Sequence, residues 1–321
     1  MASLERVWRV SSVGLTRLVL ALARVTRVES GSHSPIFRRR VGARASSVWP
    51  LVSTAFLVWL EGKVAIITGG ASGIGASTVH LFHEHGANVV IADVQDNLGQ
   101  AIAEKYGEKV SYIHCDVSNE DDVCNLIDTT IAKHGQLDIM YSNAGIVDSS
   151  YMRILDSTKT DIERVLGVNL VGAFLGAKHA ARVMIPQRKG CILFTSSASA
   201  SIAGLSSHAY AASKSGVLGL ARNLAAELGQ YGIRVNCVSP YAVVIGTGMV
   251  PLSAEEAAKT EMAVNEIGNL KGHILKAIDV AKAALYLVSE DANYISGLNL
   301  LVDGGYSVVN PSMRNFLGSP P

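Results

Sequence analysis

A buried strand that runs directly into a glycine-rich turn constrains this chain more than any other feature. Residues 63–67, Lys-Val-Ala-Ile-Ile, form a mostly apolar, β-branched run, the pattern of a central parallel strand buried on both faces. The run continues into Thr68-Gly69-Gly70-Ala71-Ser72-Gly73-Ile74-Gly75, and a helical pattern follows through Gly86. Glycines in such a turn let backbone N–H groups at the helix N-terminus approach a pyrophosphate. This order of elements predicts a dinucleotide-binding α/β fold, with Gly69, Ser72, Gly73, Ile74 and Gly75 at the cofactor.

Strand-like and helix-like segments alternate along the rest of the chain. Strand-like runs recur at residues 88–93, 110–114, 137–141, 191–195, 233–238 and 298–302, and helical patterns lie around 95–106, 119–134, 158–185, 207–230 and 278–289. Such alternation predicts a doubly wound parallel sheet with right-handed crossovers. Because we find no internal linker or repeat, we expect a single domain over residues 59–310 and a loose tail at 311–321.

The first 58 residues differ in composition from the remainder. They contain nine Arg, nine Ser, no Lys and only two acidic residues, which is typical of an organelle transit peptide. If the segment is one, the protein belongs in a plastid or mitochondrion, and otherwise in the cytoplasm. An unstructured leader without an address and a wrongly assigned first exon stay open as alternatives. The apolar patch at residues 48–60 is too short to span a bilayer, and we expect no membrane partner.

The rest of the chain is mildly acidic, with 19 basic and 25 acidic residues. This balance argues against a nucleic acid as the main partner. The four cysteines are scattered without a Cys-x-x-Cys pair, so we expect buried thiols in a reducing compartment. His80, His83 and His85 lack a metal-ligand spacing and a further ligand set; we expect a partly exposed helix face and no metal.

Asp93 ends the second predicted strand, eighteen residues after Gly75. A carboxylate at this place accepts hydrogen bonds from the adenosine ribose hydroxyls and repels a 2′-phosphate. No basic residue lies inside the glycine turn, so we predict NAD rather than NADP as the cofactor. The alternative is that Asp93 is only a solvated acid at a strand end.

Ser197, Tyr210 and Lys214 form the candidate catalytic group. On a helix, Tyr210 and Lys214 stand one turn apart on the same face. A fixed ammonium favours the phenolate and would bring the phenol pKa from near 10 towards the working range. Ser197 follows an apolar strand-like run, where its hydroxyl could hold the oxygen of an alcohol or carbonyl. Each residue alone also fits packing or helix capping.

Together these residues resemble the short-chain dehydrogenase/reductase family over residues 60–306. The resemblance rests on the Thr68–Gly75 loop, Tyr210-x-x-x-Lys214, and further matches at Asp116, Asn143-Ala144-Gly145, Asn169, Ser197 and the ending Ser296-Gly297…Val302-Asp303-Gly304-Gly305. It implies a Rossmann-like sheet of about seven strands and a catalytic tetrad in which Asn169 holds a relay water. It also implies that Asp116 and Val117 flank the adenine and that Asn143, Ala144 and Gly145 support the cofactor cleft.

Within the family the chain looks most like the plant group of secoisolariciresinol dehydrogenase, xanthoxin dehydrogenase, momilactone A synthase and zerumbone synthase. That resemblance implies NAD-dependent oxidation of a secondary alcohol on a small apolar terpenoid- or lignan-like molecule. It also implies a homodimer or homotetramer assembled through the helices at 158–185 and 207–230, and a substrate lid at 241–276. Thr247 is the expected contact to the nicotinamide carboxamide, although the segment before it is about two residues longer than the family pattern.

Two other functions stay open. One is a reductase of a steroid or 3-oxoacyl substrate, because residues alone do not set the direction of reaction. The other is a non-catalytic dinucleotide-sensing or scaffold protein, against which all four tetrad residue types argue.

Overall fold

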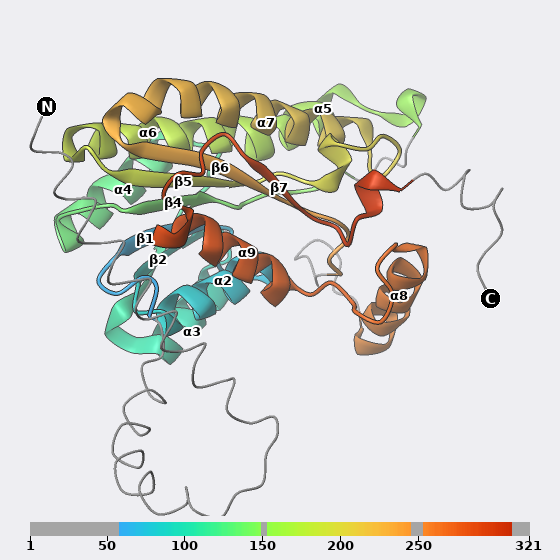
Figure 1. Ribbon diagram of the computed structural model, residues 1–321, viewed down its shortest axis with the longest axis horizontal. Coiled ribbons are helices and arrows are strands. Elements are labelled where there is room, and N and C mark those ends of the chain that lie inside the picture. Colours follow the sequence, from blue (N-terminus) through green and yellow to red (C-terminus); the bar gives the residue numbers. More distant parts are fainter. Residues whose placement is uncertain (1–57, 149–152, 245–252, 310–321) are drawn as a thin grey trace, which may run out of the picture. The chain divides into compact units, whose positions relative to one another are not determined.

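In the computed structural model, seven parallel strands form one sheet with the order β3-β2-β1-β4-β5-β6-β7 (Figure 1). The structure describes residues 58–148, 153–244 and 253–309. The single sheet of seven parallel strands confirms the predicted doubly wound parallel sheet. The strands are β1 (Val64–Thr68), β2 (Asn88–Asp93), β3 (Val110–His114), β4 (Ile139–Ser142), β5 (Gly190–Thr195), β6 (Ile233–Pro240) and β7 (Asn299–Val302).

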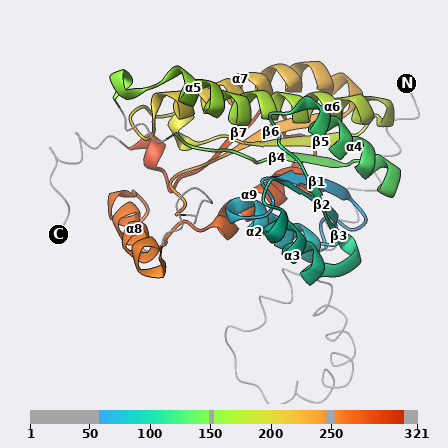
Figure 2. The same cartoon turned by 180° about the vertical axis from the view of Figure 1, so that it is seen from behind.

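Helices cover both faces of this sheet (Figure 1 and, from behind, Figure 2). Neighbouring strand residues point to opposite faces, so Ile66 and Phe194 enter one apolar core while Ile67 and Leu193 enter the other. The face with α2 and α3 also carries α9, and the opposite face carries α4, α5, α6 and α7. The helices are α2 (Gly73–Glu84), α3 (Asp96–Tyr106), α4 (Glu120–His134), α5 (Lys159–Leu166), α6 (Gly172–Gln187), α7 (His208–Leu228), α8 (Ala254–Ile267) and α9 (Ala277–Val288).

The strand order reverses direction between β1 and β4, which are neighbours at the centre of the sheet. β2 and β3 lie on one side of β1, and the chain then crosses to β4 on the other side. In open α/β sheets, ligands bind in the crevice outside the carboxyl ends of the strands at such a switch point. The glycine turn follows β1 directly and therefore lies at this crevice.

The helix expected at residues 158–185 is present as an unbroken run of helical residues, but it is not α-helical throughout. A π-helical segment, Gly167–Val171, separates α5 from α6. It contains Asn169, which is buried and exchanges two hydrogen bonds with the backbone of Ile146: its Nδ2 donates to the Ile146 carbonyl at 2.9 Å and its Oδ1 accepts from the Ile146 N–H at 2.8 Å. π segments are frequent at functional sites, because the wider turn redirects one side chain.

The region expected as a lid, residues 241–276, contains a helix that the sequence pattern did not predict. α8 begins at a capping box in which the Ser253 hydroxyl accepts from the Glu256 N–H and the Glu256 carboxylate accepts from the Ser253 N–H. It lies at the carboxyl ends of β6 and β7 (Figure 1). Its role as a lid stays a prediction.

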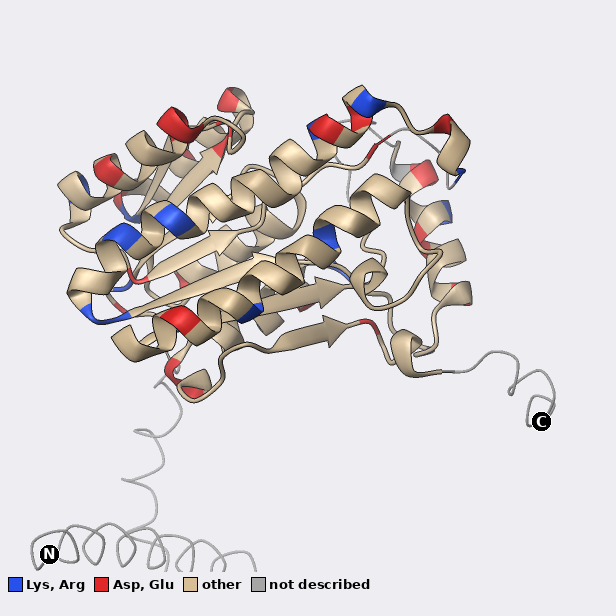
Figure 3. Ribbon diagram, turned by 90° about the horizontal axis from the view of Figure 1, so that it is seen from above, with Lys and Arg blue, Asp and Glu red and all other residues tan. Residues whose placement is uncertain are grey.

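Other expectations concern residues outside the described part of the chain. Of the predicted leader, only Val58 belongs to the described part. The tail at 311–321 and Thr247 also lie outside it. In the described part, Lys, Arg, Asp and Glu are interspersed over the helices (Figure 3), and no helix there has the length and apolar character that crossing a bilayer requires.

The packing of α6 against the β3–α4 loop generates a stability prediction. A Cβ added at Gly172 would lie 2.7 Å from Cγ2 of Val117 and 3.1 Å from its carbonyl oxygen, whereas a Cβ at Gly229 would meet nothing within 4 Å. We expect Gly172→Ala to lower the free energy of unfolding by about 1–3 kcal/mol, because a β-branched side chain and backbone have to move. Gly229 has helical φ and ψ, so the control Gly229→Ala should raise it by about 0.4–1 kcal/mol. Urea unfolding measures both, and equal effects would contradict the prediction.

Candidate functional site

Two adjoining cavities lie at the carboxyl ends of the central strands. The first has a volume of about 420 Å³ and the second about 390 Å³. The glycine turn and the ends of β2 and β3 line the first, and Ser197, Tyr210 and Lys214 line the second. Ile74, Asn143, Gly145 and Ile146 line both. The predicted cofactor residues and the predicted catalytic residues thus meet along a shared wall.

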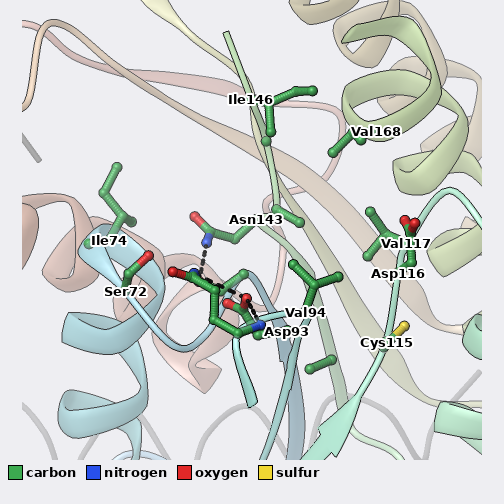
Figure 4. Close-up of a pocket in the computed structure, with 16 residues that line it drawn as sticks. Ser72, Ile74, Asp93, Val94, Cys115, Asp116, Val117, Asn143, Ile146 and Val168 are labelled. Atoms are coloured by element: carbon green, nitrogen blue, oxygen red, sulfur yellow. Dashed lines mark hydrogen bonds between the residues drawn. The ribbon is translucent and has the colours of Figure 1, made fainter. Parts of the chain in front are cut away.

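The glycine turn brings the backbone very close to the start of α2. Gly69 and Gly73 both have left-handed φ values, +63° and +54°. A Cβ at Gly75 would lie 2.0 Å from the Gly69 carbonyl oxygen, so this contact excludes any side chain. The first turn of α2 therefore opens towards the cavity, where free backbone N–H groups favour an anion. Ser72 and Ile74 lie on one side of this cavity and Asp116 and Val117 on the other (Figure 4).

Asp93 is not a solvated strand-end acid, because it is only 6% exposed. Its Oδ2 accepts a hydrogen bond from the Ala71 N–H at 3.0 Å, and its Oδ1 accepts from the N–H and the side-chain amide of Gln95 at 3.1 and 3.2 Å. The carboxylate thus holds the glycine turn as well as lining the cavity (Figure 4). Gln95 is a site residue that the sequence reasoning missed, although it follows Asp93 by only two residues.

Asp116 and Val117 line the far end of the first cavity with Cys115 and Val168. Val117 is buried, and Oδ1 of Asp116 accepts from the Ser118 N–H and hydroxyl at 2.9 and 2.7 Å. An apolar side chain beside an anchored carboxylate suits a flat heterocycle such as adenine, which the family resemblance places here. Burial, together with nearby carboxylates, raises the pKa of the Cys115 thiol to about 12, so it stays neutral.

Asn143 joins the ends of three neighbouring strands. Its backbone N–H donates to Oγ1 of Thr68 at 3.0 Å, and its Nδ2 donates to the Thr68 carbonyl at 3.0 Å. Its Oδ1 accepts from the Thr195 hydroxyl at 2.9 Å. The Ala144 N–H donates to the same Thr68 hydroxyl at 3.0 Å. Thr68 and Thr195 were not among the predicted site residues, although each ends a strand-like run.

Tyr210 and Lys214 lie one turn apart on α7, as the spacing predicted. The Lys214 Nζ is 5.6 Å from the centroid of the Tyr210 ring and donates to the Thr195 carbonyl at 2.9 Å. A Cβ at Gly145 would lie 3.1 Å from this Nζ, so glycine leaves the ammonium its space. Lys214 is buried at 3% exposure, and its fixed position follows from these neighbours.

The expected lowering of the Tyr210 pKa by Lys214 is not found. Burial raises the pKa of Tyr210, and a hydrogen bond with Ser197 opposes this. Burial also lowers the pKa of Lys214, to about 8. Both shifts have one physical cause: loss of water disfavours the phenolate and the ammonium alike. In this structure the hydrogen bond with Ser197 favours the Tyr210 phenolate, and burial opposes it.

Asn169 and Ser197 complete the predicted tetrad. The Asn169 Nδ2 donates to the hydroxyl of Ser213 at 3.1 Å, beside Lys214 on α7, in addition to its bonds with Ile146. Ser197 caps the short helix Ala198–Ala200, and its hydroxyl accepts from the Ser199 N–H. The structure therefore places three tetrad residues on the second cavity, with Asn169 bound to its wall at Ile146.

The histidines of α2 make aromatic contacts. His80 and His83 have ring centroids 5.9 and 4.8 Å from that of Tyr106. His85 lies against Trp59, with ring centroids 5.8 Å apart. Within residues 58–148, 153–244 and 253–309, no group of three His, Cys, Asp or Glu side chains is arranged to hold a metal ion. All four cysteines are free thiols, and Cys124 is only partly buried.

The chain is similar in sequence to known oxidoreductases over most of its length. A family model described as enoyl-(acyl carrier protein) reductase matches residues 69–307. The chain is 60% identical to (+)-borneol dehydrogenase 1 from Salvia officinalis over 259 residues, which covers 81% of this chain and 99% of the relative. It is 55% identical to secoisolariciresinol dehydrogenase from Forsythia intermedia over 266 residues, with coverage of 83% and 96%.

A solved structure also matches this fold. The crystal structure of gox2181 superimposes with a TM-score of 0.72 at 31% sequence identity, covering 78% of this chain and 98% of that chain.

The buried ammonium of Lys214 generates a pH prediction. Its pKa in the folded protein is about 8, below its ordinary 10.5. Below pH 8 the folded state carries the whole cost of burying the charge. As the pH rises from 8 to 10.5 that cost disappears, because Lys214 has lost its proton in the folded state while it still carries it in the unfolded state. The wild type should therefore gain up to about 3 kcal/mol of stability relative to Lys214→Met over this range.

Denaturant unfolding across the same pH range measures this difference. Lys282→Met removes an exposed ammonium from α9 and is the matched control, for which no such gain is expected. If the difference in unfolding free energy between the wild type and Lys214→Met does not change with pH, the lysine is not buried as a charge.

Proposed function

Because this chain belongs to the short-chain dehydrogenase/reductase family of oxidoreductases, we propose that it is an NAD-dependent dehydrogenase of secondary alcohols on small apolar molecules. The observation that carries the proposal is the meeting of Ser197, Tyr210 and Lys214 in a cavity that shares a wall with the cavity of the glycine turn. Hydride transfer needs substrate and cofactor to be held side by side, and adjoining cavities favour that arrangement.

The first cavity fits a nicotinamide dinucleotide. The close backbone approach at Gly75 favours phosphate oxygens at the start of α2, and a carboxylate that lines the cavity at Asp93 favours ribose hydroxyls. Its described lining residues include two acids, Asp93 and Asp116, and no Lys or Arg. A 2′-phosphate beside Asp93 would meet a negative charge and, among these described residues, no positive one, which favours NAD over NADP.

When bound, NAD⁺ supplies the hydride acceptor. For oxidation, the Tyr210 phenolate takes the proton of the substrate hydroxyl while the neighbouring C–H bond gives up its hydride. Ser197 donates a hydrogen bond to the same oxygen as the carbonyl forms. Lys214 holds a positive charge beside this centre, and Asn169 fixes the cavity wall at Ile146. Reduction of a ketone uses the same groups in reverse order.

The second cavity favours an apolar substrate. Ile74, Ile146, Val147, Leu205 and Val243 line it, and Lys214 is its one charged residue among the described residues. Two relatives are named as dehydrogenases of borneol, a terpenoid alcohol, and of secoisolariciresinol, a lignan alcohol. We therefore propose a terpenoid- or lignan-like alcohol as the substrate class.

Assembly as a homodimer or homotetramer also stays a proposal. α7 exposes small residues along one side, at Ala212, Ser215 and Gly219. Small side chains let a second helix approach closely, which supports the expected packing through α5, α6 and α7.

Turnover by the purified full chain tests the proposed activity. Formation of NADH from NAD⁺, or of NADPH from NADP⁺, is followed with borneol or secoisolariciresinol as the alcohol, and the reverse reaction is followed with camphor, the ketone of borneol. Oxidation with NAD⁺ supports the proposal. NAD⁺ binding without turnover in either direction, over a panel of terpenoid and lignan alcohols, would instead favour a dinucleotide-sensing protein.

Removing the Tyr210 hydroxyl tests the acid/base role. We expect Tyr210→Phe to lower kcat by a factor of about 10² to 10⁴ and to leave the Kd for NAD⁺ within about twofold, because only the proton acceptor is lost. Tyr294→Phe is the matched control, since Tyr294 is fully exposed. A Tyr210→Phe enzyme with nearly full activity would refute this role.

Neutralising Asp93 tests the cofactor preference. Asp93→Asn keeps a side-chain acceptor for the Ala71 N–H but removes the charge that opposes a 2′-phosphate. The ratio of kcat/KM for NAD⁺ to that for NADP⁺ should fall at least about tenfold, equivalent to about 1.4 kcal/mol. Asp116→Asn removes a charge from the other end of the same cavity and should change the ratio less. An unchanged ratio in Asp93→Asn would limit Asp93 to holding the turn.

A further inference from the structure

The hydroxyl of Ser197 has an unusual pair of hydrogen-bond partners, because both belong to one residue. The Ser199 N–H donates to Oγ of Ser197 at 3.2 Å, and the Ser199 hydroxyl lies 2.8 Å from the same oxygen. Ser199 is only 8% exposed and lines the second cavity with Ser197 and Tyr210. Ser199 is not among the residues that the sequence predicts for the site.

The two bonds from Ser199 limit where the proton of the Ser197 hydroxyl can point. A serine hydroxyl has one proton and two acceptor lone pairs. No hydrogen-bond partner of the Ser199 hydroxyl other than Ser197 is present in the described part of the chain. If Ser199 donates, its N–H and O–H occupy both lone pairs of Ser197. The proton of Ser197 is then the only group left to make a further bond, and it has to point towards the cavity.

Tyr210 lies on that side. The hydrogen bond with Ser197 lowers the pKa of Tyr210, which is the effect of a donor that favours the phenolate. This agrees with a Ser197 proton directed at the reacting oxygens and not back at Ser199. A chain of donors, from Ser199 to Ser197 and on to the oxygen in the cavity, also strengthens each bond through polarisation.

We propose that Ser199 is a positioning residue, which occupies both lone pairs of Ser197 and so directs the Ser197 proton to the substrate oxygen. The proposal rests on the proposed function, since it concerns the same site. Ser199 itself does not touch the reacting atoms in this scheme. Its effect passes entirely through Ser197.

Kinetics gives the first test, with borneol and NAD⁺ as the probe pair. Ser199→Ala removes the O–H donor but keeps the N–H donor, so Ser197 can rotate its proton away from the cavity. We expect kcat to fall about 2- to 10-fold, the effect of one hydrogen bond, with KM for NAD⁺ nearly unchanged. Ser199→Thr keeps a hydroxyl and should recover most of the rate. Ser201→Ala, on the exposed side of the same turn, is the matched control.

A double-mutant cycle separates positioning from general packing. If Ser199 acts through Ser197, adding Ser199→Ala to Ser197→Ala should cost nothing more. An equal loss in both backgrounds would assign Ser199 a packing role and overturn the proposal. If Ser197→Ala loses rate but Ser199→Ala does not, the proposed function stands and this inference fails.

A second readout does not depend on turnover. NMR titration of the protein with isotope-labelled tyrosine, with the Tyr210 signal assigned through Tyr210→Phe, gives the Tyr210 pKa directly. Ser199→Ala should raise this pKa, because a misdirected Ser197 no longer favours the phenolate, while Lys214 beside the ring is unchanged. Ser201→Ala should leave it as in the wild type. An unaltered pKa in Ser199→Ala would overturn the inference even in a protein that oxidises no alcohol tested.

Discussion

The hydrogen bonds among Thr68, Asn143 and Thr195 are the constraint on which the rest of the site depends. They join the ends of β1, β4 and β5 at 2.9–3.0 Å, at the point where the strand order reverses. On one side the glycine turn leaves β1 from Thr68. On the other side the Thr195 carbonyl accepts from the Lys214 Nζ. These three short side chains therefore connect the strand ends that carry the two cavities.

Most of the fold could be predicted because its signals are local. β2 and β3 were placed at their observed bounds, since each holds three β-branched or aromatic residues within a run of five or six. The π segment around Asn169 could not be predicted, because a widened turn leaves the apolar pattern of a helix nearly intact. α8 was missed for another reason: its mixed composition hid a helix, although Ser253-x-x-Glu256 is a capping-box signal in the sequence itself.

The site was predictable where chemistry needs particular residue types at fixed spacing. The spacing of Tyr210 and Lys214 placed both on one face of α7, and Asp93 was placed correctly at the end of its strand. The partners of these residues could not be predicted: the Ala71 N–H, the Thr195 carbonyl and Ser199 are contacts of the folded backbone. For the same reason the burial that raises the pKa of Tyr210 was missed, since the sequence shows the lysine neighbour but not the missing water.

The wall shared by the two cavities, formed by Ile74, Asn143, Gly145 and Ile146, has a thermodynamic consequence. Where an occupant of one cavity shifts these shared residues, the binding free energies of the two occupants are coupled. Such coupling is reciprocal: if the cofactor tightens alcohol binding, the alcohol tightens cofactor binding by the same factor. An alcohol that binds weakly to the free protein can therefore still be a good ligand of the binary complex. With such coupling, a ligand screen against the free protein would rank alcohols differently from a screen against the dinucleotide complex.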